Sequence, residues 1–171
     1  MAQTLFNGTT AVRPADVPNI TQAVPFFGVK DIEASLRFYI DGLGFTMTRH
    51  WAPEGRIRWC WLELDRVAVM LQEYWKDGRP GGSPAGVPGQ GVCICLMCED
   101  AIAVYHNANA RGLQPSKPSV ENGLWVTSLV DPDGYRLDFE SPADVREELS
   151  SSTRRADTDP LRQAEGMEES K

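Results

Sequence analysis

The sequence predicts an α+β protein built from two βαβββ modules. Three observations lead to this fold class: short apolar runs typical of strands, two amphipathic helical stretches that each follow an Asp, and an order of elements that occurs twice. Val29-Lys30-Asp31-Ile32 in the first half matches Cys98-Glu99-Asp100-Ala101 in the second. We expect the paired modules, within one chain or between two, to form a cupped mixed sheet with a cleft and with the helices on the outside.

The first module begins with the apolar run Ala23–Val29, which predicts a buried strand. Asp31 then occupies the position of a helix N-cap, and glycines at 42 and 44 end the helix. The apolar face of this predicted helix consists of Ile32, Leu36, Tyr39, Ile40 and Leu43. Three further strands are predicted over Phe45–His50, Ile57–Leu64 and Val67–Tyr74, the last two joined as a hairpin through Asp65-Arg66.

The second module follows a Gly- and Pro-rich linker, Lys76–Pro84, and repeats the order of the first. Val92–Cys98 predicts a strand, Asp100 an N-cap, and Gly112 the end of the helix. The predicted helix face consists of Ala101, Val104, Tyr105 and Ala108. Leu124–Val130 and Tyr135–Phe139 predict two strands joined by the turn Asp131-Pro132-Asp133-Gly134.

Composition sets the limits of the folded domain and excludes some classes of protein. We expect an N-terminal tail over 1–20, a domain over 21–143 (modules 21–77 and 90–143), and a mobile acidic C-terminal tail over 144–171, which contains no aromatic residue. The formal net charge of −7 argues against a nucleic-acid partner. Apolar runs are too short for a membrane span, and the N-terminus does not have the pattern of a secretory signal, so we expect a cytoplasmic protein.

Two stretches carry a family resemblance. The first, in the first module, consists of Ala23-Val24-Pro25-Phe26, Val29-Lys30-Asp31-Ile32, Phe38-Tyr39 and Gly42-Leu43-Gly44-Phe45. The second, near the end of the second module, is Asp131-Pro132-Asp133-Gly134-Tyr135-Arg136-Leu137-Asp138-Phe139. Together they resemble the vicinal oxygen chelate superfamily, which includes glyoxalase I, extradiol dioxygenases, fosfomycin-resistance enzymes and bleomycin-resistance proteins. The resemblance covers about 120 residues and is more specific for fold than for function, because this fold carries many chemistries.

The resemblance also implies where a metal would bind. The family's ligand positions map to Val24, Leu71, Cys93 and Asp138, and two of these side chains are hydrocarbons without a lone pair. The mapping favours the metal-free, bleomycin-resistance-like members, with no cofactor. A register shift by two residues keeps the same face of a strand and leaves a divalent metal open, held by Gln22, Glu73 and Cys93 with Asp138 or Glu140. A shift by one, to Gln72, would turn that side chain to the other face.

The cysteines and histidines give a weaker signal. Cys93 and Cys95 share one face of a strand and Cys98 points to the other, so we interpret these thiols, together with Cys60, as buried, reduced small hydrophobes. His50 and His106 are predicted to be solvated surface side chains.

Aromatic and acidic residues define the predicted ligand-binding surface. Trp59 and Trp61 lie two residues apart and therefore share a face, where they either fill the core or stack on a flat or cationic ligand. The predicted ligand-binding set is Phe26, Trp59, Trp61, Glu73, Cys93, Trp125, Asp138 and Glu140. We expect the ligand to be a small molecule, cationic or aromatic, bound at a cleft of a homodimer.

Three functional hypotheses follow. The first is a metal-free protein that sequesters a small molecule, like the bleomycin-resistance proteins. The second is a metal-dependent lyase, isomerase or dioxygenase of the same superfamily. The third is a non-catalytic regulatory module, for which the acidic tail is the only indication.

Overall fold

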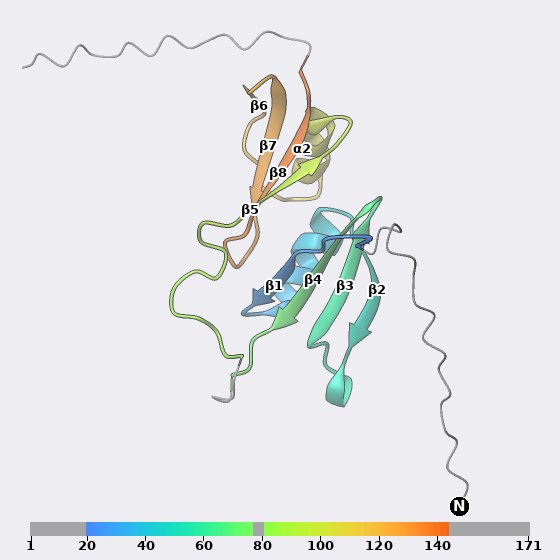
Figure 1. Ribbon diagram of the computed structural model, residues 1–171, viewed down its shortest axis with the longest axis vertical. Helices are drawn as coiled ribbons and strands as arrows, with labels where there is room; N and C mark the ends of the chain where they lie inside the picture. Colours follow the sequence, from blue (N-terminus) through green and yellow to red (C-terminus); the bar gives the residue numbers. More distant parts are fainter. Residues whose placement is uncertain (1–19, 77–80, 144–171) are drawn as a thin grey trace, which may run out of the picture.

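The computed structural model describes residues 20–76 and 81–143, and these form two four-stranded sheets. The first module contains β1 (Phe26–Val29), α1 (Ile32–Leu36), the π-helical η1 (Arg37–Gly42), β2 (Thr46–Trp51), the short η2 (Pro53–Gly55), β3 (Trp59–Leu64) and β4 (Val67–Glu73). The second contains β5 (Cys93–Met97), α2 (Ala101–Ala110), β6 (Ser119–Glu121), β7 (Leu124–Val130) and β8 (Arg136–Pro142). Figure 1 shows the two groups of strands one above the other, joined by residues 81–92 along one side.

The sheets have the same topology. Sheet 1 has the order β1-β4-β3-β2 and sheet 2 the order β5-β8-β7-β6, and in each the first strand pairs parallel to the last. The other neighbours are antiparallel. Each module is therefore a βαβββ unit with a mixed sheet, and the α+β fold class predicted from the sequence is confirmed.

Both predicted N-caps are confirmed. The Asp31 side chain accepts hydrogen bonds from the backbone N–H groups of Glu33 and Ala34, and Asp100 does the same for Ile102 and Ala103. The first helix is not α-helical throughout, because it widens into η1, where the backbone N–H of Leu43 donates to the carbonyl of Phe38. β6 is a further strand that the hydrophobic pattern does not indicate, since it is only three residues long.

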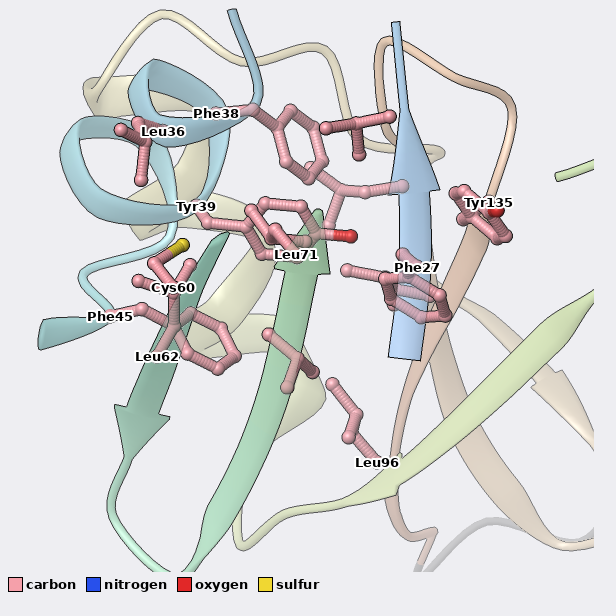
Figure 2. Close-up of a cluster of buried hydrophobic side chains, with 14 of the residues drawn as sticks. Phe27, Leu36, Phe38, Tyr39, Phe45, Cys60, Leu62, Leu71, Leu96 and Tyr135 are labelled. Atoms are coloured by element: carbon pink, nitrogen blue, oxygen red, sulfur yellow. The ribbon is translucent and has the colours of Figure 1, made fainter. Parts of the chain in front are cut away.

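Strand alternation gives each sheet a helix face and an open face. In sheet 1 the helix face carries Phe27, Cys60, Leu62 and Leu71, all buried. Figure 2 shows these side chains packed against Leu36, Tyr39 and Phe45, with Leu96 and Tyr135 of the second module reaching the same cluster. One hydrophobic core therefore joins the two modules.

Polar contacts dock the β7–β8 turn onto the first module. The Tyr39 hydroxyl donates to Asp131, and the Lys30 backbone N–H donates to Asp133, both at 3.1 Å. Tyr135 stacks on Phe27 with ring centres 4.2 Å apart. Burial is the main reason that the pKa values of Tyr39, Asp131 and Asp133 all lie above their ordinary values. The predicted turn thus also fixes the second module against the first.

The predicted linker is partly packed against the domain. The Trp75 backbone N–H donates to the Gly81 carbonyl within it at 3.2 Å. Just after the linker, the Lys30 ammonium donates to the Gly86 carbonyl and the Gly89 N–H to the Asp133 carbonyl, both at 2.9 Å. Residues 77–80 of the linker lie outside the described residues, as do the predicted tails except for Ile20. Within the described ranges, no helix is long and apolar enough to cross a membrane.

Candidate functional site

The open face of sheet 1 brings three predicted binding residues together. Phe26 pairs with Met70 on β4, and Met70 pairs with Trp61 on β3. Trp59 lies on the same face two residues before Trp61, and both indoles are partly exposed. Phe26 is 53% exposed, although it is a large apolar side chain. This face is therefore an aromatic surface that residues 20–76 and 81–143 leave partly uncovered.

Two charged residues on this face were missed by the sequence analysis. The guanidinium of Arg49 lies 5.0 Å from the ring centre of Trp61, and the Trp61 indole N–H donates to the Glu63 carboxylate at 2.7 Å. The alternation of Trp59, Trp61 and Glu63 along β3 could have placed Glu63 on this face. The position of Arg49 beside Trp61 depends instead on how β2 pairs with β3. Because Arg49 already covers Trp61, we expect Trp59 to be the more accessible ring for a ligand.

The open face of sheet 2 carries the predicted Cys93, Asp138 and Glu140. Cys93 lies on β5, next to β8, where Asp138 and Glu140 follow in alternation. Met97 on β5 is 65% exposed and Val130 on β7 is 60% exposed, so this face also has uncovered apolar area. The two open faces differ in chemistry, one being aromatic and the other rich in sulfur and carboxylate.

Asp138 is held as a carboxylate by its neighbours. Burial alone would raise its pKa, but hydrogen bonds from Arg136, Ser128 and Cys93 outweigh burial and lower it. The Arg136 Nε–H donates to Asp138 at 2.7 Å, and the Cys93 thiol donates at 3.2 Å. Partial burial, together with this hydrogen bond, raises the pKa of Cys93 to about 12. Cys93 is thus a protonated donor near neutral pH and not an activated nucleophile.

Two predicted binding residues do not lie on an open face. Glu73 has a fully buried side chain on the helix face of sheet 1, in ion pairs with Arg56 and Arg58. The Ser141 hydroxyl accepts the backbone N–H of Ala101 at the start of α2, so Ser141 lies on the helix face of sheet 2. Trp125 pairs with Ser141 across β7 and β8 and therefore lies on the same face. The prediction that Glu73 adds negative charge to the cleft is therefore wrong, because its charge is neutralised inside the module.

The mapping of metal-ligand positions onto β4 was also wrong by one residue. Leu71 is fully buried on the helix face, so the open-face positions of β4 are Met70 and Gln72. Gln72 thus lies on the open face, whereas the sequence predicted that it lies on the face opposite the metal-ligand positions. Among the residues that the structure describes, no group of three or more His, Cys, Asp or Glu could hold a metal ion. Since Glu73 is paired with two guanidinium groups, the alternative ligand set does not fit a metal within this chain.

The interpretation of the cysteines holds only in part. Cys60 is buried as predicted, and burial raises its pKa to about 11. Cys93 and Cys95 are exposed, because both point to the uncovered face of sheet 2. His50 and His106 are exposed, as predicted.

A pocket of about 650 Å³ lies between the β3–β4 hairpin and the second module. Its lining includes Leu64 and Val67 from the hairpin and Leu96, Val104 and Phe139 from the other module. None of the eight predicted binding residues lines it. The predicted binding residues therefore lie outside this pocket, six of them on the open faces and Glu73 and Trp125 on the helix faces.

Sequence comparison identifies the family. Residues 20–139 match the model of the Glyoxalase/Bleomycin resistance protein/Dioxygenase superfamily, which is most of the chain and nearly all of its described part. The chain belongs to this superfamily.

Named relatives and solved structures agree with this assignment. Proteins named bleomycin resistance protein from Geobacillus stearothermophilus and Staphylococcus aureus are each 26% identical over 129 residues, covering 69% of this chain and 94% of the relative. A glyoxalase/bleomycin resistance protein/dioxygenase from Nocardioides has a TM-score of 0.57 at 20% identity, covering 77% of this chain and 89% of the other. A bleomycin-binding protein in complex with bleomycin has a TM-score of 0.54 at 23% identity, covering 71% and 98%. These structures share the fold.

Proposed function

We propose that this protein binds a small aromatic or cationic molecule and sequesters it without chemical change, as a bleomycin-resistance-like protein. The observation that carries the proposal is the aromatic open face of sheet 1, where Phe26, Trp59 and Trp61 lie together and partly exposed. Family membership and the names of the curated relatives support it.

The two open faces supply different parts of the binding energy. Trp59 and Phe26 offer ring faces to a flat or cationic group, each such contact contributing about 0.5–2 kcal/mol. Asp138 and Glu140 offer carboxylate acceptors, and the lowered pKa of Asp138 keeps it charged at neutral pH. Micromolar binding requires about 8 kcal/mol, which a few such contacts in a largely apolar cleft can supply.

We further propose that two copies form a homodimer in which sheet 1 of one copy faces sheet 2 of the other. Phe26, Met97 and Val130 support this arrangement, since each is an apolar side chain more than half exposed on an open face. Pairing the faces would cover these side chains and place the aromatic surface opposite the carboxylates.

The domain would comprise residues 21–143, with the segments 1–20 and 144–171 outside it. The net charge of −7 supports a function without nucleic acid. We propose a cytoplasmic protein that acts without a membrane partner.

A titration tests the proposed function. Bleomycin without metal is titrated into the full chain, and binding is followed by calorimetry and by tryptophan fluorescence. Saturable binding is expected, weakened about tenfold or more by Trp59→Ala, since an aromatic anchor at the centre of an interface is costly to lose. Trp125→Phe is the matched control, because Trp125 lies on the helix face.

Two outcomes would contradict the proposal. One is equal binding by the wild type and Trp59→Ala. The other is stoichiometric divalent metal in protein purified without chelator, together with turnover of a substrate. The metal result would favour the enzymatic members of the superfamily.

A further inference from the structure

A second pocket lies at the end of sheet 1 where β2 ends and β3 begins. It has a volume of about 410 Å³ and is lined by Trp51, Pro53, Glu54, Arg56, Arg58 and Trp75. Arg58 immediately precedes Trp59, and strand alternation turns it to the helix face of the sheet. Trp59 and Trp61 do not line this pocket, but Trp51 pairs with Trp59 across β2 and β3, so the pocket borders the aromatic open face.

Arg58 is fixed in this pocket with one donor left without an acceptor. Its guanidinium pairs with Glu73, donates to the Tyr74 carbonyl at 3.2 Å, and lies 4.3 Å from the ring centre of Trp75. Only 11% of the side chain is exposed, and its buried Nε has no hydrogen-bond partner among the described residues. A buried N–H without an acceptor is costly, and an anionic oxygen would satisfy it.

The surroundings of Arg58 are positively charged overall. Arg56 Nη2 lies 2.7 Å from Glu73, and the Lys76 ammonium is 3.6 Å from the same carboxylate. Three cations thus surround the buried carboxylate of Glu73, while Glu54 is the acidic residue among those that line the pocket. Arg56 keeps 54% of its side chain exposed, so it can approach a ligand while it stays paired. Glu73 acts as a positioning residue that holds both guanidinium groups at this end of the sheet.

Trp51 supplies an apolar surface beside these charges. Its side chain is 49% exposed, and its ring meets Trp75 edge to face with ring centres 6.4 Å apart. We propose that this pocket binds a small aromatic carboxylate. The carboxylate accepts hydrogen bonds from the Arg58 Nε–H and from Arg56, and the ring of the ligand stacks on Trp51. The volume lies within the usual range of small-molecule sites.

The experiment uses benzoate as the probe and the full chain as the protein. Calorimetry and tryptophan fluorescence are expected to show saturable binding at millimolar concentration or below. Trp51→Ala and Arg56→Gln should each weaken it about tenfold, the loss expected for one aromatic or charge-assisted contact. Both changes are at exposed positions, so the fold should survive them. Arg58→Lys keeps the charge but removes the Nε donor, and should weaken binding as well.

Arg49→Gln is the matched control, since it removes an arginine that lies over Trp61 on the open face. Benzylamine should not compete, and inorganic phosphate should compete weakly because it has no ring to stack. The inference is overturned if benzoate does not bind, if the Trp51 and Arg56 variants bind as the wild type does, or if phosphate competes as well as benzoate. Phe26→Ala, on the edge strand opposite β2, should weaken bleomycin binding but leave benzoate binding unchanged, which separates this result from the test of the proposed function.

Discussion

At the scale of single residues, side chains of one type differ widely in their surroundings. Cys60 is fully buried in the core, whereas Cys93 is exposed beside Asp138. Glu73 is buried between guanidinium groups, whereas Glu63 accepts a hydrogen bond from Trp61 at a partly exposed position. These differences follow from strand register, since each position alternates between the helix face and the open face.

Cys93 should be a slow nucleophile. Its pKa is raised to about 12 by partial burial and by the hydrogen bond to Asp138, so the thiolate is scarce near neutral pH. Asp138→Asn removes the negative acceptor and should lower this pKa, so that iodoacetamide labels Cys93 faster than in the wild type. Peptide mass spectrometry over a pH series measures the rate at each cysteine. A wild-type Cys93 that reacts faster than an unstructured cysteine would contradict this assignment.

At the scale of elements, the N-caps are the clearest link between sequence and structure. The Asp100 side chain accepts two backbone N–H groups at 2.9 Å at the start of α2. Asp100→Ala should lower the free energy of unfolding by about 1 kcal/mol, whereas Asp100→Ser, which retains a capping oxygen, should cost less. Urea unfolding of the three proteins measures the difference. Equal losses for Ala and Ser would mean that the cap does not stabilise the helix.

Local patterns predicted most of the fold. β7 has its predicted bounds, and both helices begin after the predicted caps. Hydrophobic alternation and helix capping depend on residues close together in the sequence, so both can be predicted from it. The π-helical turn of η1 and the short β6 were not predicted. The π-helical turn differs from an α-helix by a single shift of hydrogen-bond partner, from Leu43 to Phe38, and β6 has only three residues, too few for a clear alternation.

The candidate site was less predictable than the fold. Phe26, Trp59, Trp61, Cys93, Asp138 and Glu140 lie on open faces, and for Trp59 and Trp61 this decides between the core and the surface that the sequence left open. Glu73 and Trp125 do not, because a strand assignment from sequence leaves the buried face ambiguous, and the same ambiguity misplaced Leu71. Arg49 was missed because its contact with Trp61 is made across strands.

At the scale of the whole molecule, a buried carboxylate links the two modules. The Asp131 carboxylate accepts the Tyr39 hydroxyl and the backbone N–H groups of Asp133 and Tyr135. Burial raises the pKa of Asp131 above its ordinary value of 3.8. The folded protein therefore retains this proton to a higher pH than the unfolded chain does. The stability that Asp131 contributes is fully present below pH 3.8 and is lost as the pH rises through the folded pKa.

Asp131→Asn removes this titration. The free energy of unfolding of the wild type, minus that of the variant, should fall as the pH rises from about 3 to about 7. Urea unfolding of both proteins across this range measures the difference, and the shared contribution of other groups cancels. A difference that stays constant or grows with pH would show that Asp131 does not titrate as its burial implies.

The most direct test of the proposed dimeric binding site is a mixing experiment. One chain carries Trp59→Ala on sheet 1 and the other carries Asp138→Asn with Glu140→Gln on sheet 2, so that each alone binds bleomycin poorly. The two chains are unfolded together, refolded and titrated with bleomycin. If each cleft joins sheet 1 of one copy to sheet 2 of another, random pairing should restore roughly a quarter of the wild-type sites at wild-type affinity. No recovery of tight binding in a mixture that has exchanged chains would contradict the account.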